Sequence, residues 1–187
     1  MSKTFIIGVA GGSASGKTTF SGKLKNKLSN KNVLEIHMDK YFLPEAERPC
    51  IKAPITEINY RDDNHPNSFN LAKLKSDLND FIKSKEYQVI IIEGLLSLWD
   101  KDICGLLDLK LFIDCQADER IVRRLRRNMK ERGLSFDEIS NVYLDAVRYR
   151  HNEFVEPSKW QADFILNGSK QSELALDIIV NYINLIV

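Results

Sequence analysis

The sequence predicts an α/β fold in which a mainly parallel five-stranded sheet carries helices on both faces. Short apolar runs rich in β-branched residues alternate with helical patterns along the whole chain, as in parallel sheets with helical crossovers. One of these runs, residues 89–92, reads VIII and is typical of a central strand covered on both faces. The predicted strands cover residues 4–10, 33–37, 89–92, 109–114 and 163–166.

The predicted helices are marked by apolar residues that recur every three or four positions. Asn70 precedes one helix as a candidate N-cap, and Ser135 with Glu138 forms a candidate capping box ahead of another. The apolar sets are Phe20, Leu24 and Leu28; Leu71, Leu74, Leu78, Phe81 and Ile82; Ile139, Val142, Tyr143, Ala146 and Val147; and Leu174, Ile178, Ile179, Tyr182 and Ile183.

Length and composition bound the class of protein. The 187 residues predict a single domain, residues 1–187, with a substantial core. A net charge of +1 gives no general reason to expect a nucleic acid or a membrane surface as partner. The apolar run near the N-terminus is too short for a signal peptide or a spanning helix. Three scattered cysteines without metal-ligand spacing indicate reduced thiols and a cytoplasmic protein. The sequence is compatible with a homo-oligomer.

The segment after the first predicted strand fits G-x-x-x-x-G-K-[ST], the phosphate-binding loop, and a helical pattern follows it directly. Glycines let successive backbone N–H groups converge on an anion at a helix N-terminus. Lys17 supplies a cation for the β- and γ-phosphates, and the Thr18 hydroxyl can ligate Mg²⁺. We therefore expect a P-loop NTPase fold that binds a nucleoside triphosphate, rather than an ordinary glycine-rich corner. The expected phosphate-binding residues are Gly11, Gly12, Ser13, Ala14, Ser15, Gly16, Lys17, Thr18 and Thr19.

Carboxylates follow several predicted strands, at the edge where open α/β sheets bind their ligands. Asp39 lies just past residues 33–37, and Glu93 lies just past residues 89–92. Either side chain could hold Mg²⁺ or accept the proton of an attacking hydroxyl. The alternative for both is a solvated carboxylate or a helix cap. For Asp114, at the end of the fourth predicted strand, a turn is the stronger alternative.

An arginine-rich helix is predicted over about residues 118–133. We expect a helical lid whose arginines fold over the triphosphate and offset the charge that develops in the transition state. The alternatives are a solvated charged face and a nucleic-acid stripe, and the second is disfavoured because no aromatic residues are interleaved. The apolar residues of this helix, expected to pack inward, are Ile121, Leu125 and Met129.

Residues 41–69 interrupt the alternation with four prolines and no clear periodicity. A loop of this length in a compact domain is usually functional or disordered. His65 could contact a substrate, although a structural role as a hydrogen-bonding residue is the stronger expectation. His37 and His151 are expected to be structural.

Together these motifs resemble the uridine kinase and phosphoribulokinase superfamily of P-loop small-molecule kinases over nearly the whole chain. Residues 8–19 resemble the family's opening signature, and residues 91–95 match its I-x-E-G-I segment. Residues 39–42 and 65–69 are similar to its D-S-F-Y and H-P-D-A-F segments. Residues 123–163 follow the pattern of its lid and C-terminal part without an evident gap.

The resemblance implies transfer of the γ-phosphoryl group of ATP, with Mg²⁺, to a hydroxyl of a small acceptor such as a nucleoside. It implies that Asp39 is the catalytic base, with Lys17, Arg124 and Arg127 as further catalytic residues that hold the phosphates. The expected magnesium site is formed by Thr18, Glu93 and Asp39. Residues 41–69 are expected to bind the acceptor, through Tyr60, Asn64 and His65 together with Arg124.

The resemblance weakens where uridine kinases hold the nucleoside. Asn64 replaces an aspartate, and Leu134 and Val142 stand where the family usually has arginine and glutamine. Residues 85–88 leave no room for the base-binding hairpin that the family carries between its second helix and the E-G strand. An apolar side chain cannot replace a hydrogen-bond donor, so these changes indicate an altered acceptor specificity.

Several other functions are compatible with a phosphate-binding loop. A nicotinamide riboside kinase fits the shorter acceptor region. A nucleoside monophosphate kinase needs arginines between the second and third strands to bind the phosphate of its acceptor. It fits less well, because only Arg48 and Arg61 lie there. A switch GTPase is disfavoured because residues 165–170 lack N-K-x-D. An ATP-binding regulatory protein without kinase activity is disfavoured by Asp39 and Glu93.

Overall fold

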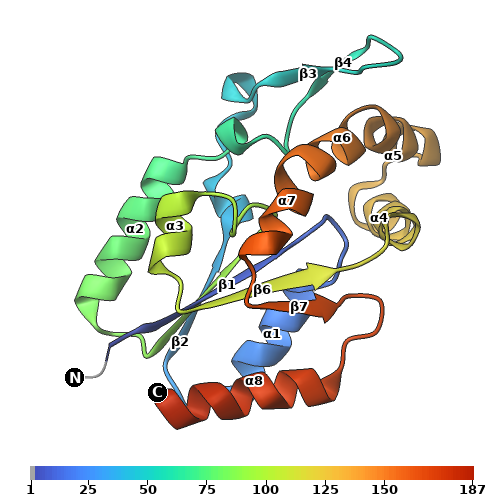
Figure 1. Ribbon diagram of the computed structural model, residues 1–187. Helices are drawn as coiled ribbons and strands as arrows, with labels where there is room; N and C mark the ends of the chain where they lie inside the picture. Colours follow the sequence, from blue (N-terminus) through green and yellow to red (C-terminus); the bar gives the residue numbers. More distant parts are fainter. Residues whose placement is uncertain (1–2) are drawn as a thin grey trace.

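A five-stranded parallel sheet forms the centre of the computed structural model, which describes residues 3–187 (Figure 1). The strands lie in the order β2-β5-β1-β6-β7, and every neighbouring pair is parallel. The predicted sheet is therefore confirmed, with bounds that differ from the expected ones by at most one residue at either end. The strands are β1 (Phe5–Gly11), β2 (Val33–His37), β5 (Val89–Glu93), β6 (Leu109–Asp114) and β7 (Phe164–Asn167).

Helices cover both faces of this sheet because its central strands are apolar on both sides. In β5, Ile90 and Ile92 pack into one core, whereas Val89 and Ile91 pack into the other. The first core is closed by α2 (Leu71–Ser84) and α3 (Lys101–Leu106). The second is closed by α1 (Lys17–Lys27) and α8 (Glu173–Ile186) (Figure 1).

Two longer helical segments lie beyond the carboxyl ends of β1 and β6 (Figure 1). The first is α4 (Ala117–Arg132), and Gly133 in the left-handed conformation ends it. The second begins at the predicted capping box, which is present in full between Ser135 and Glu138. It runs as α5 (Phe136–Val142), a π-helical turn (Tyr143–Val147), α6 (Arg148–Arg150), a second π-helical turn (His151–Val155) and α7 (Glu156–Ser158).

The expectation that Ile121, Leu125 and Met129 pack inward on α4 is wrong in part. Met129 is 47% exposed, and the buried residues of this helix are Arg120 and Asn128. The side of α4 that faces the protein meets backbone and polar groups, including the carbonyl of Cys115. A polar residue that can donate a hydrogen bond there is therefore buried in place of an apolar one.

Residues 41–69 fold into short elements rather than one irregular loop. They contain β3 (Cys50–Lys52) and β4 (Asn59–Arg61), which form an antiparallel hairpin that projects from the domain (Figure 1). Three 3₁₀ turns flank the hairpin: Met38–Tyr41, Glu45–Glu47 and Pro66–Ser68. Only residues 85–88 connect α2 to β5, so nothing like a hairpin stands between them.

Between residues 3 and 187, no helix is long and apolar enough to cross a membrane. The three cysteines are unpaired, Cys50 at the surface and Cys115 in the interior.

Candidate active site

The turn between β1 and α1 has the backbone conformation that an anion-binding loop requires. Gly11 and Gly16 have φ values of 148° and 100°, in the range that only glycine adopts without strain. A Cβ on Gly11 would lie 2.5 Å from the carbonyl oxygen of Ile113. Gly16 is the N-cap of α1, so the loop delivers backbone N–H groups and the positive end of the helix to the same place.

Glu93 meets Lys17 and Thr18 where β5 ends. The Thr18 hydroxyl donates to Glu93 Oε1 over 3.2 Å, and Lys17 Nζ lies 3.6 Å from the same oxygen. Glu93 is only 5% exposed. The sheet register explains the meeting, because Glu93 is opposite Val9 near the end of β1.

His37 is a further member of this cluster that sequence reasoning assigned to a structural role. Its Nδ1 lies 3.0 Å from Glu93 Oε2, and its Nε2 lies 3.9 Å from Glu35 Oε1. The parallel register places His37 directly opposite Glu93. The sequence shows only that His37 ends one predicted strand and that Glu93 directly follows the next one along the chain.

Asp39 lies one turn beyond β2, in the 3₁₀ turn Met38–Tyr41, and is exposed. It faces a cavity of about 150 Å³ at the carboxyl edge of the sheet. Most of the predicted site residues come together around this cavity: Ser13, Lys17, Thr18, Asp39, Asn64, Glu93, Arg124 and Arg127. Asp63, Arg132, Phe42, Phe69 and Leu95 complete the lining and were not predicted.

Arg124 connects α4 to the phosphate-binding loop. Its Nη1 donates to the Ser13 hydroxyl over 2.9 Å, and its Nε is buried with no partner in the described chain. Burial, together with the charges of Arg127 and Arg132, lowers the pKa of Arg124 to about 10. Three guanidinium groups gathered in this way are complementary to a polyanion.

A second cavity, of about 600 Å³, continues from the first across the start of α1. Arg123, Arg127 and Glu131 of α4 face it from one side. The loop and the first turn of α1 face it from the other, through Ala14, Gly16, Lys17, Thr18 and Thr19. The two cavities share Lys17, Thr18 and Arg127, so a long polar ligand can extend from one into the other.

The predicted acceptor contacts divide into two groups. Asn64 lines the first cavity, but Tyr60 and His65 do not. The Tyr60 hydroxyl donates to Asp145 Oδ2 over 2.8 Å. His65 Nδ1 accepts from the backbone N–H of Asn67 over 3.0 Å, and its ring packs edge-on against Phe154.

A buried ion pair on this side of the cavity was not predicted. Asp62 is 1% exposed, and Arg150 Nε lies 2.5 Å from its Oδ2. Asp62 Oδ1 accepts from the backbone N–H of Asn64 over 3.1 Å, and its carbonyl accepts from the Ser68 hydroxyl. The pair therefore fixes the backbone that carries Asp63 and Asn64 into the cavity.

Arg120 and His151 support the phosphate-binding loop from behind. Arg120 is buried, and its Nε donates to the Cys115 carbonyl over 2.9 Å. A Cβ on Gly12 would lie 2.6 Å from Arg120 Nη1 and 3.0 Å from His151 Cε1. Burial and the charge of Arg120 lower the pKa of His151 to about 4. His151 is thus an uncharged interior residue near neutral pH.

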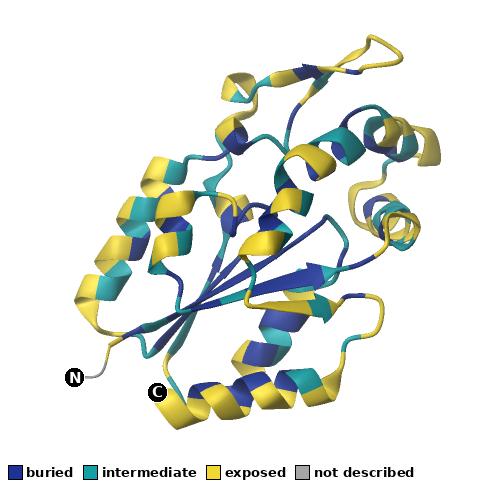
Figure 2. Ribbon diagram, in the orientation of Figure 1, coloured by how far each residue is buried: buried dark blue, intermediate teal, exposed yellow. Residues whose placement is uncertain are grey.

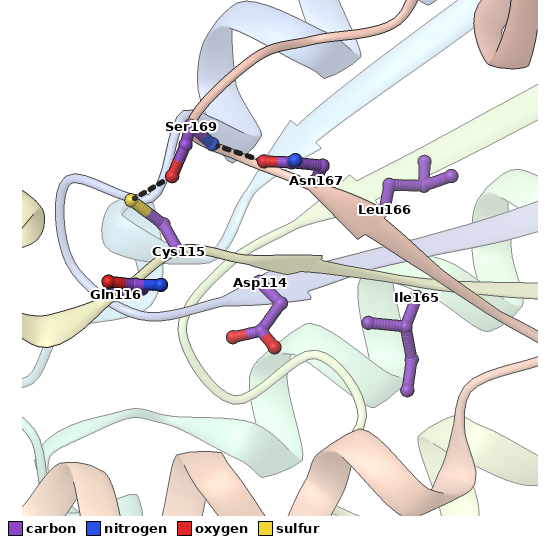
Figure 3. Close-up of a pocket in the computed structure, with 7 residues that line it drawn as sticks. All are labelled: Asp114, Cys115, Gln116, Ile165, Leu166, Asn167 and Ser169. Atoms are coloured by element: carbon purple, nitrogen blue, oxygen red, sulfur yellow. Dashed lines mark hydrogen bonds between the residues drawn. The ribbon is translucent and has the colours of Figure 1, made fainter.

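Asp114 lies apart from the cavity that holds Lys17. It faces a separate open pocket with Gln116, Asn167 and Ser169, at the carboxyl ends of β6 and β7 (Figure 3). Lys159 Nζ lies 3.6 Å from its Oδ2. Within residues 3–187, no three His, Cys, Asp or Glu side chains gather as metal ligands. A Mg²⁺ ion in the cavity near Lys17 would therefore have few protein ligands, as is usual for Mg²⁺ that is bound together with phosphates.

Known proteins are similar to this chain over most of its length. The model of the "Phosphoribulokinase / Uridine kinase family" matches residues 6–84 and 68–175. A uridine kinase of Lactobacillus helveticus is 33% identical over 202 residues, which cover 96% of this chain and 93% of the relative.

Solved structures share the fold. A possible uridine kinase from Bacillus stearothermophilus aligns with a TM-score of 0.59 and 16% identity, covering 88% of this chain and 89% of that one. The phosphoribulokinase from Rhodobacter spheroides aligns with a TM-score of 0.65 and 13% identity, covering 88% and 70%.

Proposed function

The chain belongs to the phosphoribulokinase and uridine kinase family, and on that premise we propose that it phosphorylates a hydroxyl of a nucleoside, uridine or cytidine, using ATP and Mg²⁺. Membership of the family makes it an ATP-dependent phosphotransferase that acts on a hydroxyl group. The observation that supports this proposal best is the single cavity around which Lys17, Asp39, Glu93 and Arg124 meet.

Three features of the chain fit the triphosphate. The glycine cradle of the loop leaves room for anionic oxygens, and the N-terminus of α1 points into it. Within residues 3–187, the buried Nε of Arg124 and the buried hydroxyl of Ser15 have no hydrogen-bond partner. These polar groups are costly to bury unless a ligand satisfies them. Lys17 and Arg127 face both cavities and would hold the β- and γ-phosphates between them.

The magnesium ion fits the oxygens near Lys17. Thr18 and Glu93, 3.2 Å apart, would hold it, with Asp39 across the same cavity. A Mg²⁺ ion held there would offset the charge that develops on the phosphate oxygens. His37 holds the other oxygen of Glu93 and so fixes the orientation of that carboxylate.

Asp39 would act as the general base. Its carboxylate accepts the proton of the acceptor hydroxyl as the hydroxyl oxygen forms a bond to the γ-phosphorus. The bond from that phosphorus to the bridging oxygen breaks, and ADP leaves with the electron pair. The guanidinium groups of Arg124 and Arg127 stabilise the charge on the transferred group.

The acceptor side of the cavity has an apolar wall and a polar one. Phe42 and Phe69, stacked with ring centroids 4.3 Å apart, and Leu95 form the first. Asp63 and Asn64 present a carboxylate and an amide on the second, which suits the hydroxyls of a ribose. Leu134 and Val142 do not line this cavity.

The test is ADP production from ATP and Mg²⁺ with uridine, cytidine, nicotinamide riboside, pantothenate or simple sugars as acceptor. We expect turnover with uridine or cytidine. Nicotinamide riboside is the second candidate, because the four-residue connection 85–88 removes the base-binding hairpin of uridine kinases. If none of these acceptors is phosphorylated, the proposal is contradicted and a regulatory ATP-binding protein is favoured.

A further inference from the structure

Arg48 contacts both walls of the cavity side that we propose binds the acceptor. Most of the chain around it is exposed, including the turn Glu45–Glu47 and much of the β3–β4 hairpin (Figure 2). The Arg48 side chain, in contrast, is only 14% exposed. Its guanidinium carbon lies 4.4 Å from the centre of the Phe42 ring, on the apolar wall. Its Nη1 donates to Asp63 Oδ1 over 2.9 Å, on the polar wall.

The guanidinium group of Arg48 is itself fixed in place. Its Nε donates to the backbone carbonyl of Leu43 over 2.7 Å. Leu43 directly follows Phe42, and its own N–H donates to the carbonyl of Ser68 over 2.9 Å. A planar guanidinium can stack on a ring and donate from several nitrogens at once, which the single ammonium of a lysine cannot do. One side chain therefore holds the apolar wall and the polar wall together.

The apolar wall is rigid because the Phe42 ring has two flat neighbours. One is the guanidinium of Arg48, and the other is the ring of Phe69. The two phenyl rings are 4.3 Å apart between centroids, with 26° between their planes, and Phe69 is only 4% exposed. The Phe42 ring could turn only by losing these contacts, so the wall is formed before a ligand arrives.

The two carboxylate oxygens of Asp63 are used unequally. Oδ1 accepts from Arg48 Nη1 at 2.9 Å and from Arg61 Nε at 3.0 Å. Oδ2 lies 3.5 Å from Arg61 Nη2, which is long for a hydrogen bond. An ionised carboxylate can accept about four hydrogen bonds through its two oxygens. Oδ2 therefore keeps the capacity to accept a hydrogen bond from a hydroxyl of a ligand.

We propose that Arg48 is a positioning residue for the phosphoryl acceptor: it fixes the Phe42 ring and directs Oδ2 of Asp63 towards an acceptor hydroxyl. This inference rests on the proposed function, because it gives Arg48 a role on the acceptor side alone. Arg48 does not line the cavity, so it acts through the two residues that do. Without it, Phe42 and Asp63 would move independently, while the loop around Lys17 would be unchanged.

The test is steady-state kinetics of the full chain and of the variants Arg48→Met and Arg48→Lys, with uridine, cytidine and nicotinamide riboside as acceptors. Arg48→Met should lower kcat/KM for the acceptor by roughly 10- to 100-fold, because a shift of about 1 Å in a positioning group can cost a factor of that size. KM for ATP should change little. Arg48→Lys keeps the charge but cannot make all the contacts at once, so it should recover only part of the loss.

Arg61→Met is the matched control. Arg61 donates to the same oxygen of Asp63, but its side chain is 40% exposed and also pairs with Glu45. Water screens an exposed ion pair, so this substitution should affect the acceptor far less than Arg48→Met does. Thermal unfolding of each variant, together with its KM for ATP, shows whether the protein is folded.

A double variant separates positioning from a general loss of structure. In an Asp63→Ala background, Arg48→Met should cause a smaller loss than it causes alone, because both residues act through one contact. The positioning role would be overturned by fully additive losses, by equal effects of Arg48→Met and Arg61→Met, or by a rise in KM for ATP as large as that for the acceptor. Each of these results would leave the proposed kinase activity standing. A wild-type chain that phosphorylates none of the acceptors would instead contradict the proposed function, and the role of Arg48 with it.

Discussion

The ion pair between Asp62 and Arg150 holds the side of the cavity that we propose binds the acceptor, and Arg150→Met tests that role. Removing one partner of a buried pair leaves an unpaired charge and costs about 3–5 kcal/mol of unfolding free energy. Asp62 is 1% exposed, but the Arg150 side chain keeps 19% exposure, so water can reach the vacated space. We therefore expect the lower end, about 3 kcal/mol, or a fall of roughly 6–12 °C in the unfolding midpoint.

Glu153→Gln is the matched control, because Glu153 pairs with the same guanidinium at 2.5 Å but is 50% exposed. An exposed pair contributes at most about 1 kcal/mol. In the double variant Asp62→Asn with Arg150→Met no buried charge is left unpaired, so part of the stability should return.

Chemical denaturation measures these differences, and steady-state kinetics measures the consequence for the site. Arg150→Met should raise KM for the acceptor, because Asp62 fixes the backbone of Asn64, and change KM for ATP little. Equal stability losses in Arg150→Met and Glu153→Gln would contradict the structural role of the buried pair. So would an Arg150→Met enzyme with an unchanged KM for the acceptor.

Three further changes give distinct results. Asp39→Asn removes the proposed base and should lower kcat by about 10²–10⁴-fold with little effect on KM for ATP, and near-normal turnover would exclude that role. Gly12→Ala places a Cβ 2.6 Å from the buried guanidinium of Arg120. This substitution should lower the unfolding free energy by about 1–3 kcal/mol and raise KM for ATP. Unchanged stability and an unchanged KM would show that Arg120 moves freely. The pKa of His151 is lowered from 6.5 to about 4 in the folded protein, so the unfolded chain alone binds that proton between these values. The unfolding free energy should therefore fall as the pH drops from about 6.5 towards about 4 and be unaffected by this group at neutral pH, and denaturation of His151→Gln should show a shallower fall.

Features set by local chemistry could be predicted from the sequence. The apolar runs fixed the strands because a parallel strand is buried on both faces, as in residues 89–92 of β5. The motif located the phosphate-binding loop, and the ends of the strands located Asp39 and Glu93, both of which line one cavity. The contact between His37 and Glu93 follows from the register of β2 against β5, and the sequence did not predict that these two strands pair.

Features set by contacts between distant segments could not be predicted in the same way. Asp62 and Arg150 are 88 positions apart, and neither carries a motif. Tyr60 and His65 bind to the helix that carries Arg150 instead of lining the cavity. Asn64, between them, faces the cavity because Asp62 holds its backbone.

The π-helical turns explain how the helical segment 136–158 contacts Tyr60, Asp62 and His65. Tyr143, Val147, His151 and Val155 are all buried, one at every fourth position. In a regular α-helix these residues would drift by about 120° around the axis, which would bring the last of them out of the core. The two π-helical turns remove that drift, because a π-helical turn contains more residues than an α-helical turn. The four-residue spacing can be read from the sequence, but a search for the usual 3.6-residue period does not detect it.

The most direct test of phosphoryl transfer to a nucleoside is ³¹P NMR of the chain with ATP, Mg²⁺ and uridine or cytidine, with Lys17→Ala as the inactive reference. We expect the γ-phosphate signal to be replaced by that of a phosphate monoester on the nucleoside, in equal amount to ADP, and Lys17→Ala to produce neither. Inorganic phosphate released at a rate that does not depend on the acceptor, or unchanged ATP with every acceptor tried, would contradict it.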